Sequence, residues 1–336
     1  LPEQRLFGVS SKQQQLLHTL GQPAAPWLIA VDGIGGIGKT SLAVAAVREI
    51  GSTQRFAGLI WVSAKPESNF VTDPALSLPQ PALDRDSLLS AMLAHFDHEP
   101  LLSSSFDAKV KTLAKLLKQR PYLVVIDNLE TVVDYETLLP LLRQLSKPSK
   151  FLLTSRHSLY AQADVYSLHL NELSQTDTSA FLRYEAEVRG VTDLSSASAA
   201  QLDQIYQVVG GNPLALKLLV GQAAVLTLSQ VLENLKAAQG RTVDDLYTYI
   251  YWQAWHLLDG VAQQVLLLMP LAQGGTLEQL QALTQLSMGQ LGHVLQQLAT
   301  LSLVQIGGNL DRRRYTIHRL TETFLLNKAI EWNKLT

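Results

Sequence analysis

The sequence contains no cysteine, only 17% charged residues, and no apolar run long enough to span a bilayer. The absence of cysteine excludes disulfides and thiolate zinc sites and fits a reducing cytoplasm, where we expect the protein to reside. A signal-peptide pattern is also absent from the N-terminus. The formal net charge of −2 gives no reason to expect a general polyanion binder.

Apolar residues, by contrast, are plentiful: 47% of the 336 residues are hydrophobic. A chain of this length typically forms two or three domains and buries a core without disulfides or metals. It begins at Leu1 rather than at a methionine. We therefore interpret it as part of a longer protein, with effector and sensor domains expected elsewhere on the full-length chain.

In the first half of the chain, short apolar runs alternate with amphipathic stretches. The expected strands are Trp27–Val31, Leu59–Ser63, Tyr122–Ile126 and Lys150–Ser155. The expected helices are Thr40–Ile50, Ser87–Phe96, Ala108–Lys118 and Tyr135–Leu145. Continuous apolar strands separated by helices indicate a parallel sheet covered on both faces. This pattern predicts an α/β domain over residues 1–170.

Helical periodicity dominates the second half. Four amphipathic stretches predict an all-α domain over residues 171–242, with Gly240–Asp245 as a linker. Residues 243–336 are expected to contain three helices followed by two short strands. The helices are Ala254–Leu268, Thr276–Leu286 and Met288–Thr300, and the strands are Leu303–Ile306 and Arg314–Ile317. That order predicts a winged-helix domain.

A phosphate-binding motif follows the first expected strand. Residues Gly33–Thr40 match G-x-x-x-x-G-K-[ST] in full, with a strand before and a helix after. The glycines let the backbone wrap phosphates and point N–H groups inward, and the helix adds its N-terminal dipole. We expect Lys39 to reach the β- and γ-phosphates and the Thr40 hydroxyl to ligate Mg²⁺. The alternative is a glycine-rich turn without a ligand.

Polar residues after the third and fourth strands complete the candidate site. Asp127 stands where a Walker B carboxylate holds Mg²⁺, or else it caps the next turn. Asn128 cannot act as a base, and Glu130 either orients the attacking water or is a solvated acid at a helix start. Arg156 either senses the γ-phosphate or is a surface arginine. The candidate catalytic residues are Lys39, Asp127, Glu130 and Arg156, and the candidate metal ligands are Thr40 and Asp127.

The order of these motifs resembles the NB-ARC branch of the STAND ATPases. The segments that carry the resemblance are Gly33–Thr40, Leu59–Val62, Leu123–Asn128, Leu152–Arg156, Gly210–Leu216 and Tyr315–Leu320. The last two resemble the family's G-L-P-L and M-H-D motifs, although Ile317 precedes the histidine and Arg319 stands where the family has an acid. The resemblance covers essentially the whole chain and implies an α/β P-loop NTPase with a parallel sheet, followed by an all-α helical domain and a winged-helix domain.

The resemblance also implies a switch. In such proteins ADP holds the domains closed, and exchange for ATP opens them and drives oligomerisation, with slow hydrolysis at most. Pro213 is implied to pack near the base and sugar, and His318 to contact the ADP β-phosphate. Phe7 and Gly8 resemble the entry motif, whose backbone reads the adenine. The candidate nucleotide-binding residues are Phe7, Gly8, Gly33, Gly35, Gly36, Ile37, Gly38, Lys39, Thr40, Ser41, Pro213, Leu214 and His318.

Other interpretations compete with these assignments. Pro213 is also an ordinary helix-start proline, and a histidine at a strand end, such as His318, is often purely structural. A DNA-binding regulator is the alternative function, but Met288–Gln297 contains no Lys or Arg, which recognition helices normally use. Nucleic acid is therefore not an expected partner. A metabolic or transporter ATPase is disfavoured because the sequence lacks both N-K-x-D and L-S-G-G-Q.

Overall fold

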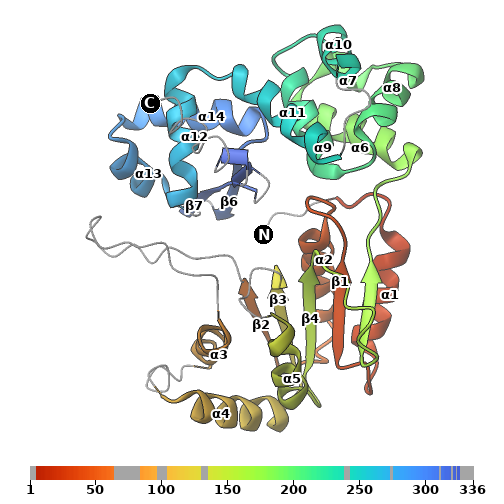
Figure 1. The fold of residues 1–336 in the computed structure, drawn as a ribbon, viewed down its shortest axis with the longest axis vertical. Helices are drawn as coiled ribbons and strands as arrows, with labels where there is room; N and C mark the ends of the chain where they lie inside the picture. Colours follow the sequence, from red (N-terminus) through yellow and green to blue (C-terminus); the bar gives the residue numbers. More distant parts are fainter. Residues whose placement is uncertain are drawn as a thin grey trace. The chain divides into compact units, whose positions relative to one another are not determined.

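The computed structural model describes residues 5–63, 84–96, 104–129, 135–237, 243–272, 275–309, 312–318, 321–322 and 324–325. The chain divides into two compact units. The α/β unit contains residues 9–171, and the helical unit contains residues 5–8 together with the described residues from 172 onward (Figure 1). No helix within the described ranges is both long and apolar enough to cross a membrane.

The α/β unit is built on a five-stranded sheet with the order β2-β3-β4-β1-β5. Every neighbouring pair of strands is parallel, which confirms the predicted parallel sheet. The strands are β1 (Leu28–Asp32), β2 (Gly58–Ser63), β3 (Tyr122–Asp127), β4 (Lys150–Ser155) and β5 (Val165–His169). Four of them were predicted. The strand β5 was not predicted, because this short edge strand mixes apolar and polar residues and lacks a continuous apolar run.

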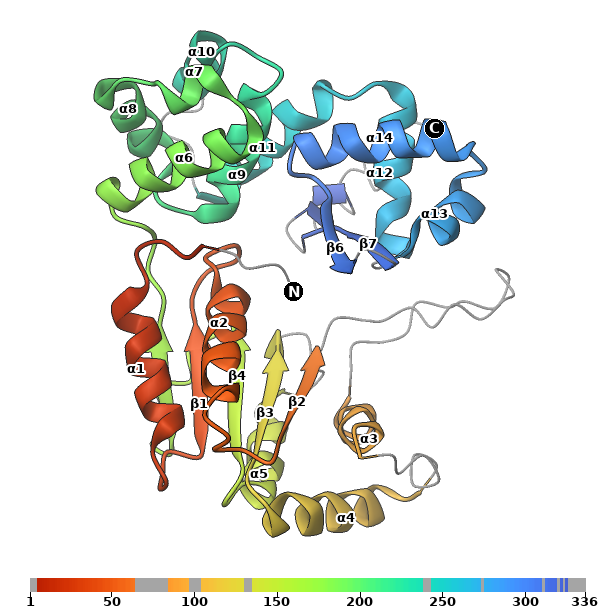
Figure 2. The same ribbon diagram turned by 180° about the vertical axis from the view of Figure 1, so that it is seen from behind.

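Helices cover both faces of this sheet. They are α1 (Ser10–Gly21), α2 (Lys39–Gly51), α3 (Arg85–Ala94), α4 (Phe106–Gln119) and α5 (Tyr135–Leu145). The first two lie on one face and the other three on the opposite face (Figures 1 and 2). The apolar cluster under α3, α4 and α5 includes Leu28, Val124 and Phe151. The helix α1 was not predicted, because its segment is polar and buries few residues, among them Leu16 and Leu20.

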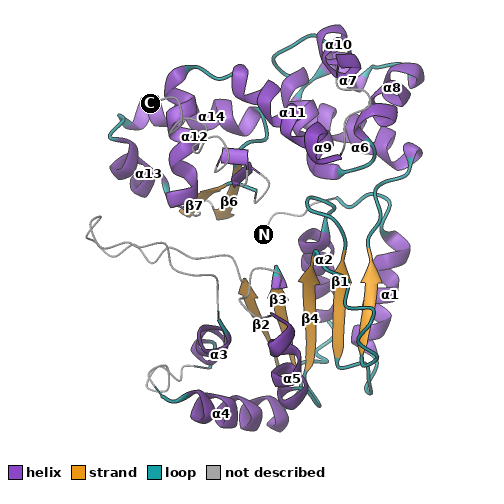
Figure 3. Cartoon of the chain, in the orientation of Figure 1, coloured by secondary structure: helices purple, strands orange, loops and turns teal. Residues whose placement is uncertain are grey.

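The helical unit contains nine helices and a strand pair among the residues described (Figure 3). The helices are α6 (Gln175–Arg189), α7 (Thr192–Ser195), α8 (Ala199–Val209), α9 (Pro213–Ala223), α10 (Leu228–Ala237), α11 (Val243–His256), α12 (Gly260–Ala272), α13 (Leu277–Thr284) and α14 (Met288–Thr300). The strands β6 (Gln305–Asn309) and β7 (Arg312–Thr316) are antiparallel. A single apolar cluster joins residues from Leu173 to Leu325, so these elements share one core.

Side-chain caps fix where several of these helices begin. Ser198, Thr276 and Ser287 form capping boxes with glutamines three residues later, at the starts of α8, α13 and α14. Each box satisfies two backbone groups that the helix itself cannot pair.

Several boundaries differ from those expected in this unit: β6 and β7 are each displaced by a few residues from the predicted strands, and two other differences have a clear cause. The predicted linker Gly240–Asp245 overlaps the start of α11 at Val243, because the helix extends back from buried residues such as Ile250. The predicted helix Ala254–Leu268 is interrupted: α11 ends at His256, and Asp259 caps α12 by accepting a hydrogen bond from the Ala262 N–H at 2.8 Å.

Candidate functional site

The loop Gly33–Thr40 joins the end of β1 to the start of α2. Gly33, Gly36 and Gly38 all have positive φ angles, of 146°, 77° and 104°. A Cβ atom on Gly33 would lie 2.7 Å from the carbonyl oxygen of Leu170, so the close approach of the chain after β5 excludes any larger residue. At Gly38 an added Cβ would meet no atom within 4 Å, but the positive φ still selects glycine. The loop therefore takes its shape from glycines, which adopt the positive φ angles that other residues rarely adopt.

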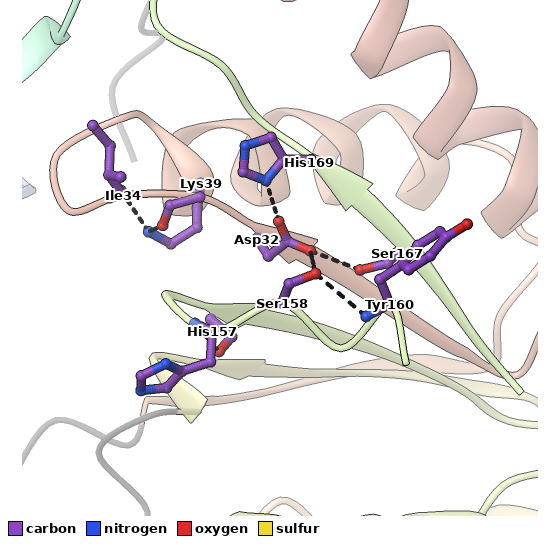
Figure 4. Close-up of polar contacts among 10 residues, drawn as sticks. Asp32, Ile34, Lys39, His157, Ser158, Tyr160, Ser167 and His169 are labelled. Atoms are coloured by element: carbon purple, nitrogen blue, oxygen red, sulfur yellow. Dashed lines mark hydrogen bonds and ion pairs between the residues drawn. The ribbon is translucent and has the colours of Figure 1, made fainter. Parts of the chain in front are cut away.

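Lys39 is buried at the first position of α2 and is 8% exposed. Its ammonium group donates hydrogen bonds to the carbonyl oxygens of Gly33 and Ile34 at 2.7 and 2.9 Å (Figure 4). The cation is thus held inside the loop that would surround the phosphates. Of the other loop candidates, Ile37 is buried, Gly35, Gly36 and Ser41 are half-buried, and the neighbouring Ile34 is exposed.

Thr40 and Asp127 are brought together from α2 and the end of β3. The Thr40 hydroxyl donates to Asp127 Oδ1 at 2.8 Å, across 87 residues of sequence. Thr154 on β4 donates to the same oxygen at 2.6 Å, and the Asn128 side chain donates to Oδ2 at 3.1 Å. These contacts orient the carboxylate toward the threonine that follows Lys39. Thr154, which lies inside the Leu152–Arg156 segment, was not among the predicted site residues.

Asn128 and Arg156 occupy the ends of neighbouring strands. Asn128 has a φ of 64°, and its N–H donates to Thr154 Oγ1 at 2.9 Å. An amide with these contacts supports Asp127 and has no base chemistry of its own. Arg156 is half-buried and directly follows β4. Glu130 lies outside the described residues.

A polar cluster at the base of the phosphate loop was not predicted. Asp32 is the last residue of β1 and only 1% exposed. It accepts hydrogen bonds from Ser167 at 2.7 Å and Ser158 at 3.1 Å, and it contacts Nδ1 of His169 (Figure 4). Burial by itself raises the pKa of Asp32, but the hydrogen bonds outweigh burial and hold the pKa below its ordinary value of 3.8. The group is therefore ionised at neutral pH. The strand-end position that singled out Asp127 also describes Asp32.

Phe7 and Gly8 belong to the helical unit and pack on α6. The Phe7 ring lies 5.5 Å from that of Phe181 and 5.4 Å from that of Tyr184. Gly8 has a φ of +64°, and a Cβ there would lie 2.9 Å from the Leu173 side chain. The Phe7 side chain is thus engaged in aromatic packing within the helical unit.

Pro213 and Leu214 begin α9 behind a tightly packed glycine pair. A Cβ on Gly211 would lie 2.1 Å from the Leu173 carbonyl oxygen, and the Leu173 N–H donates to the Gly211 carbonyl at 2.9 Å. Asn212 caps α9 by accepting from the N–H groups of Leu214 and Ala215. Pro213 is half-buried and Leu214 is buried. This segment is therefore rigidly attached to the start of the helical unit.

His318 follows β7 in the helical unit and is half-buried. Its carbonyl oxygen accepts a hydrogen bond from the Glu322 N–H at 3.0 Å. The histidine thus lies at the end of the strand pair, as the sequence predicts. Contacts to a nucleotide stay a prediction for His318, Phe7, Pro213 and Leu214.

The donor set of the α/β unit fits a magnesium nucleotide. A buried ammonium suits phosphate oxygens, and glycines at positive φ are the backbone setting in which N–H groups can converge on an anion. Thr40 and Asp127 supply a hydroxyl and a carboxylate, which are the hard oxygen ligands that Mg²⁺ prefers. A bound Mg²⁺ would supply charge neutralisation at the phosphates. Lys39 would bind the phosphates, and Thr40 and Asp127 would hold the ion.

We expect Thr40→Ala to reduce the gain in nucleotide affinity that Mg²⁺ provides by about tenfold, because a hydrogen bond or ligand to a charged group is worth roughly 1.5–3 kcal/mol. Thr40→Ser keeps the hydroxyl and should retain the gain. Titration calorimetry with and without Mg²⁺ measures the difference. Equal Mg²⁺ dependence in the alanine and serine variants would show that this hydroxyl does not serve the ion.

One protein family and several known proteins are similar to this chain. The NB-ARC domain family matches residues 9–186. An uncharacterized WD repeat-containing protein from Nostoc sp. is 27% identical over 277 residues, which is 76% of this chain and 21% of that protein. A Signal Transduction ATPase with Numerous Domains (STAND) protein with a tetratricopeptide repeat sensor, from Pyrococcus horikoshii, aligns with 96% of this chain and 43% of its own, at 16% identity and a TM-score of 0.64. A Walker-type ATPase of Pyrococcus abyssi aligns over 95% and 96% of the two chains, at 13% identity and a TM-score of 0.47.

The chain thus spans well under half the length of the first two of these proteins. The family match covers more than half of this chain and includes the phosphate loop, Asp127 and Arg156. The P. horikoshii structure shares the fold. The phosphate loop, the strand order and the family match together place this chain in the NB-ARC family of P-loop ATPases.

Proposed function

We propose that this chain is the nucleotide-operated switch of a STAND signalling protein. It binds ADP or ATP with Mg²⁺, stays closed with ADP, and opens and self-associates when ATP replaces ADP. The observation that carries this proposal is the Lys39 ammonium inside the glycine loop, beside the Thr40–Asp127 pair, in an NB-ARC fold. These groups bind phosphate and magnesium.

Slow hydrolysis, rather than rapid turnover, suits such a switch. Asn128 follows Asp127 and supports its carboxylate, and an amide cannot take a proton from water. Arg156 then serves to sense the γ-phosphate, and Glu130 is the remaining candidate base. The proposed cycle is therefore governed by nucleotide exchange.

The helical unit would provide the moving part. We assign α12, α13 and α14 with the β6–β7 pair to a winged helix, and α6 to α10 to an all-α domain. The backbone of Phe7 and Gly8, together with Pro213 and Leu214, would serve the base and sugar, and His318 would serve the ADP β-phosphate. Self-association, a cytoplasmic location and sensor or effector domains on the remaining chain belong to the same proposal. The tetratricopeptide repeat sensor of the P. horikoshii protein is an example of such a domain.

DNA binding finds no support in α14, whose sequence contains neither Lys nor Arg. We therefore retain the switch as the function that the site supports best.

Two measurements on the purified chain test this proposal. Chromatography of the denatured protein should release ADP, and calorimetry should detect ADP binding in the presence of Mg²⁺. The variant His318→Ala should bind ADP about tenfold more weakly, because it loses one hydrogen bond to a charged phosphate. The matched control is His293→Ala, which removes an exposed histidine on α14 and should leave the affinity unchanged. Absence of both retained ADP and ADP binding would refute the switch. Normal ADP binding by His318→Ala would refute only the proposed contact between His318 and the ADP β-phosphate.

A further inference from the structure

The proposed switch assigns no role to the buried carboxylate of Asp32. It directly precedes Gly33, the first residue of the phosphate loop, and it is 1% exposed. Burying a charge is unfavourable unless hydrogen bonds compensate for the lost water. Hydroxyl groups from Ser158 and Ser167 both donate to its Oδ2 atom, and His169 contacts Oδ1. Because all of its hydrogen-bonding partners are in place, the Asp32 carboxylate holds the chain segments that carry those partners beside the phosphate loop.

These partners come from two different elements. Ser167 and His169 lie on β5, and His169 pairs directly with Asp32 in the parallel register. The backbone reinforces the pairing of β1 with β5, because the Leu170 N–H donates to the Asp32 carbonyl oxygen at 2.8 Å. Ser158 instead belongs to the loop that follows β4. Asp32 therefore ties that loop to the strand that leads into the phosphate loop.

The loop after β4 carries Arg156. Ser155 accepts a hydrogen bond from the His157 N–H at 3.0 Å, which fixes the turn just after the strand. Ser158 accepts from the Tyr160 N–H at 3.3 Å while it donates to Asp32 (Figure 4). Arg156 is thus held between an anchor on its own strand and an anchor on Asp32.

We propose that Asp32 is a positioning residue for γ-phosphate sensing, and that it acts through Ser158 to hold Arg156 in register with the phosphate loop. This inference rests on the proposed function, in which Arg156 reads the γ-phosphate. A hydrogen bond to an ionised acceptor is roughly twice as strong as a neutral one, which suits an anchor for a surface loop. A guanidinium group that discriminates ATP from ADP needs to be held to within about 0.5 Å.

Ser158 and Ser167 offer a matched pair of variants. Both hydroxyls donate to the same oxygen of Asp32, but only Ser158 belongs to the Arg156 loop. Calorimetry with Mg²⁺ should measure affinities for ADP and for the non-hydrolysable analogue β,γ-imido-ATP. We expect Ser158→Ala to weaken analogue binding about fivefold, from partial loss of one charge-assisted hydrogen bond, while ADP affinity stays within about twofold. Ser167→Ala should leave the ratio of the two affinities within about twofold of wild type, since β5 keeps its backbone pairing.

Two further variants separate positioning from general damage. Ser158→Thr keeps the hydroxyl and should restore analogue binding. The double variant Arg156→Ala with Ser158→Ala should bind the analogue no more weakly than Arg156→Ala alone. The effects of residues that act through one another do not add. Ser158 is exposed, so its truncation should leave the unfolding temperature unchanged. Asp32→Asn provides an independent test. It should shift the ratio of analogue affinity to ADP affinity in the same direction as Ser158→Ala.

Several outcomes would overturn the inference. These are equal weakening of ADP and analogue binding by Ser158→Ala, equal effects of Ser158→Ala and Ser167→Ala, and additivity with Arg156→Ala. The failure of the proposed function looks different, because wild-type protein would then bind neither nucleotide.

Discussion

Replacing Lys39 with alanine should lower the affinity for both ADP and ATP by at least about 100-fold, since roughly 3 kcal/mol of charge-assisted bonding to phosphate is lost. Lys39 is 8% exposed, and its ammonium group is held by the Gly33 and Ile34 carbonyl oxygens inside the loop. It is therefore already oriented before the nucleotide arrives, and binding does not have to order a flexible side chain. Calorimetry with Mg²⁺ and each nucleotide measures the loss.

A second readout separates lost binding from lost folding. A ligand that binds only the folded state raises its stability in proportion to the logarithm of its concentration over its dissociation constant. Wild-type protein should therefore unfold at a higher temperature with saturating ADP, and Lys39→Ala should show no such rise. The matched control is Lys115→Ala, which removes an exposed lysine from α4 of the same unit. An affinity for ADP within threefold of wild type in Lys39→Ala would show that phosphates bind elsewhere.

Substitution of Gly221 by alanine should destabilise the helical unit by about 2 kcal/mol, although the change is to a better helix former. Gly221 lies inside α9, where alanine would normally gain about 1 kcal/mol. However, a Cβ there would lie 2.6 Å from the Leu301 carbonyl carbon and 2.8 Å from its Cα and carbonyl oxygen. Backbone atoms cannot move aside as a flexible side chain can, so α9 and the turn after α14 would have to separate.

The matched control for this prediction is Gly292→Ala on α14. An added Cβ at Gly292 meets no atom within 4 Å, so helix propensity acts alone and should stabilise the unit by up to about 1 kcal/mol. Denaturant unfolding compares the two variants, and hydrogen–deuterium exchange should show lost protection in α9 for Gly221→Ala only. Stabilisation by both substitutions would contradict the close contact between α9 and Leu301.

The same contact belongs to a wider junction within the helical unit. Ser302 has a positive φ of 60° and donates to the Lys217 carbonyl at 2.8 Å. Arg189 of α6 donates to the Thr300 carbonyl at 3.3 Å and also contacts Ser302 Oγ. Glu185 forms ion pairs with Arg189 and Lys217 at 3.3 and 3.4 Å. These polar contacts hold the turn after α14 close against α9, which is why the helix needs a residue without a Cβ atom at Gly221.

The amino-acid sequence by itself determined the elements whose signals are local. Four apolar runs became parallel strands, of which β1, β3 and β4 are buried. The phosphate loop was recognisable because its glycines, Lys39 and Thr40 stand close together in the sequence. Asp127 was found because it ends an apolar strand. These features depend on residues within one turn or one strand of each other, and periodicity and spacing report on such residues directly.

Only the tertiary structure decided which distant residues meet. The contact between Thr40 and Asp127, the convergence of Ser158 and Ser167 on Asp32, and the approach of Leu301 to Gly221 all join separate elements. The edge strand β5 and the helix α1 also gained their definition from neighbours, since their own apolar signals are weak. Hydrogen bonds and packing across long sequence separations leave no periodic trace in the chain, so they become visible only when the sheet order and the helix packing bring the partners together.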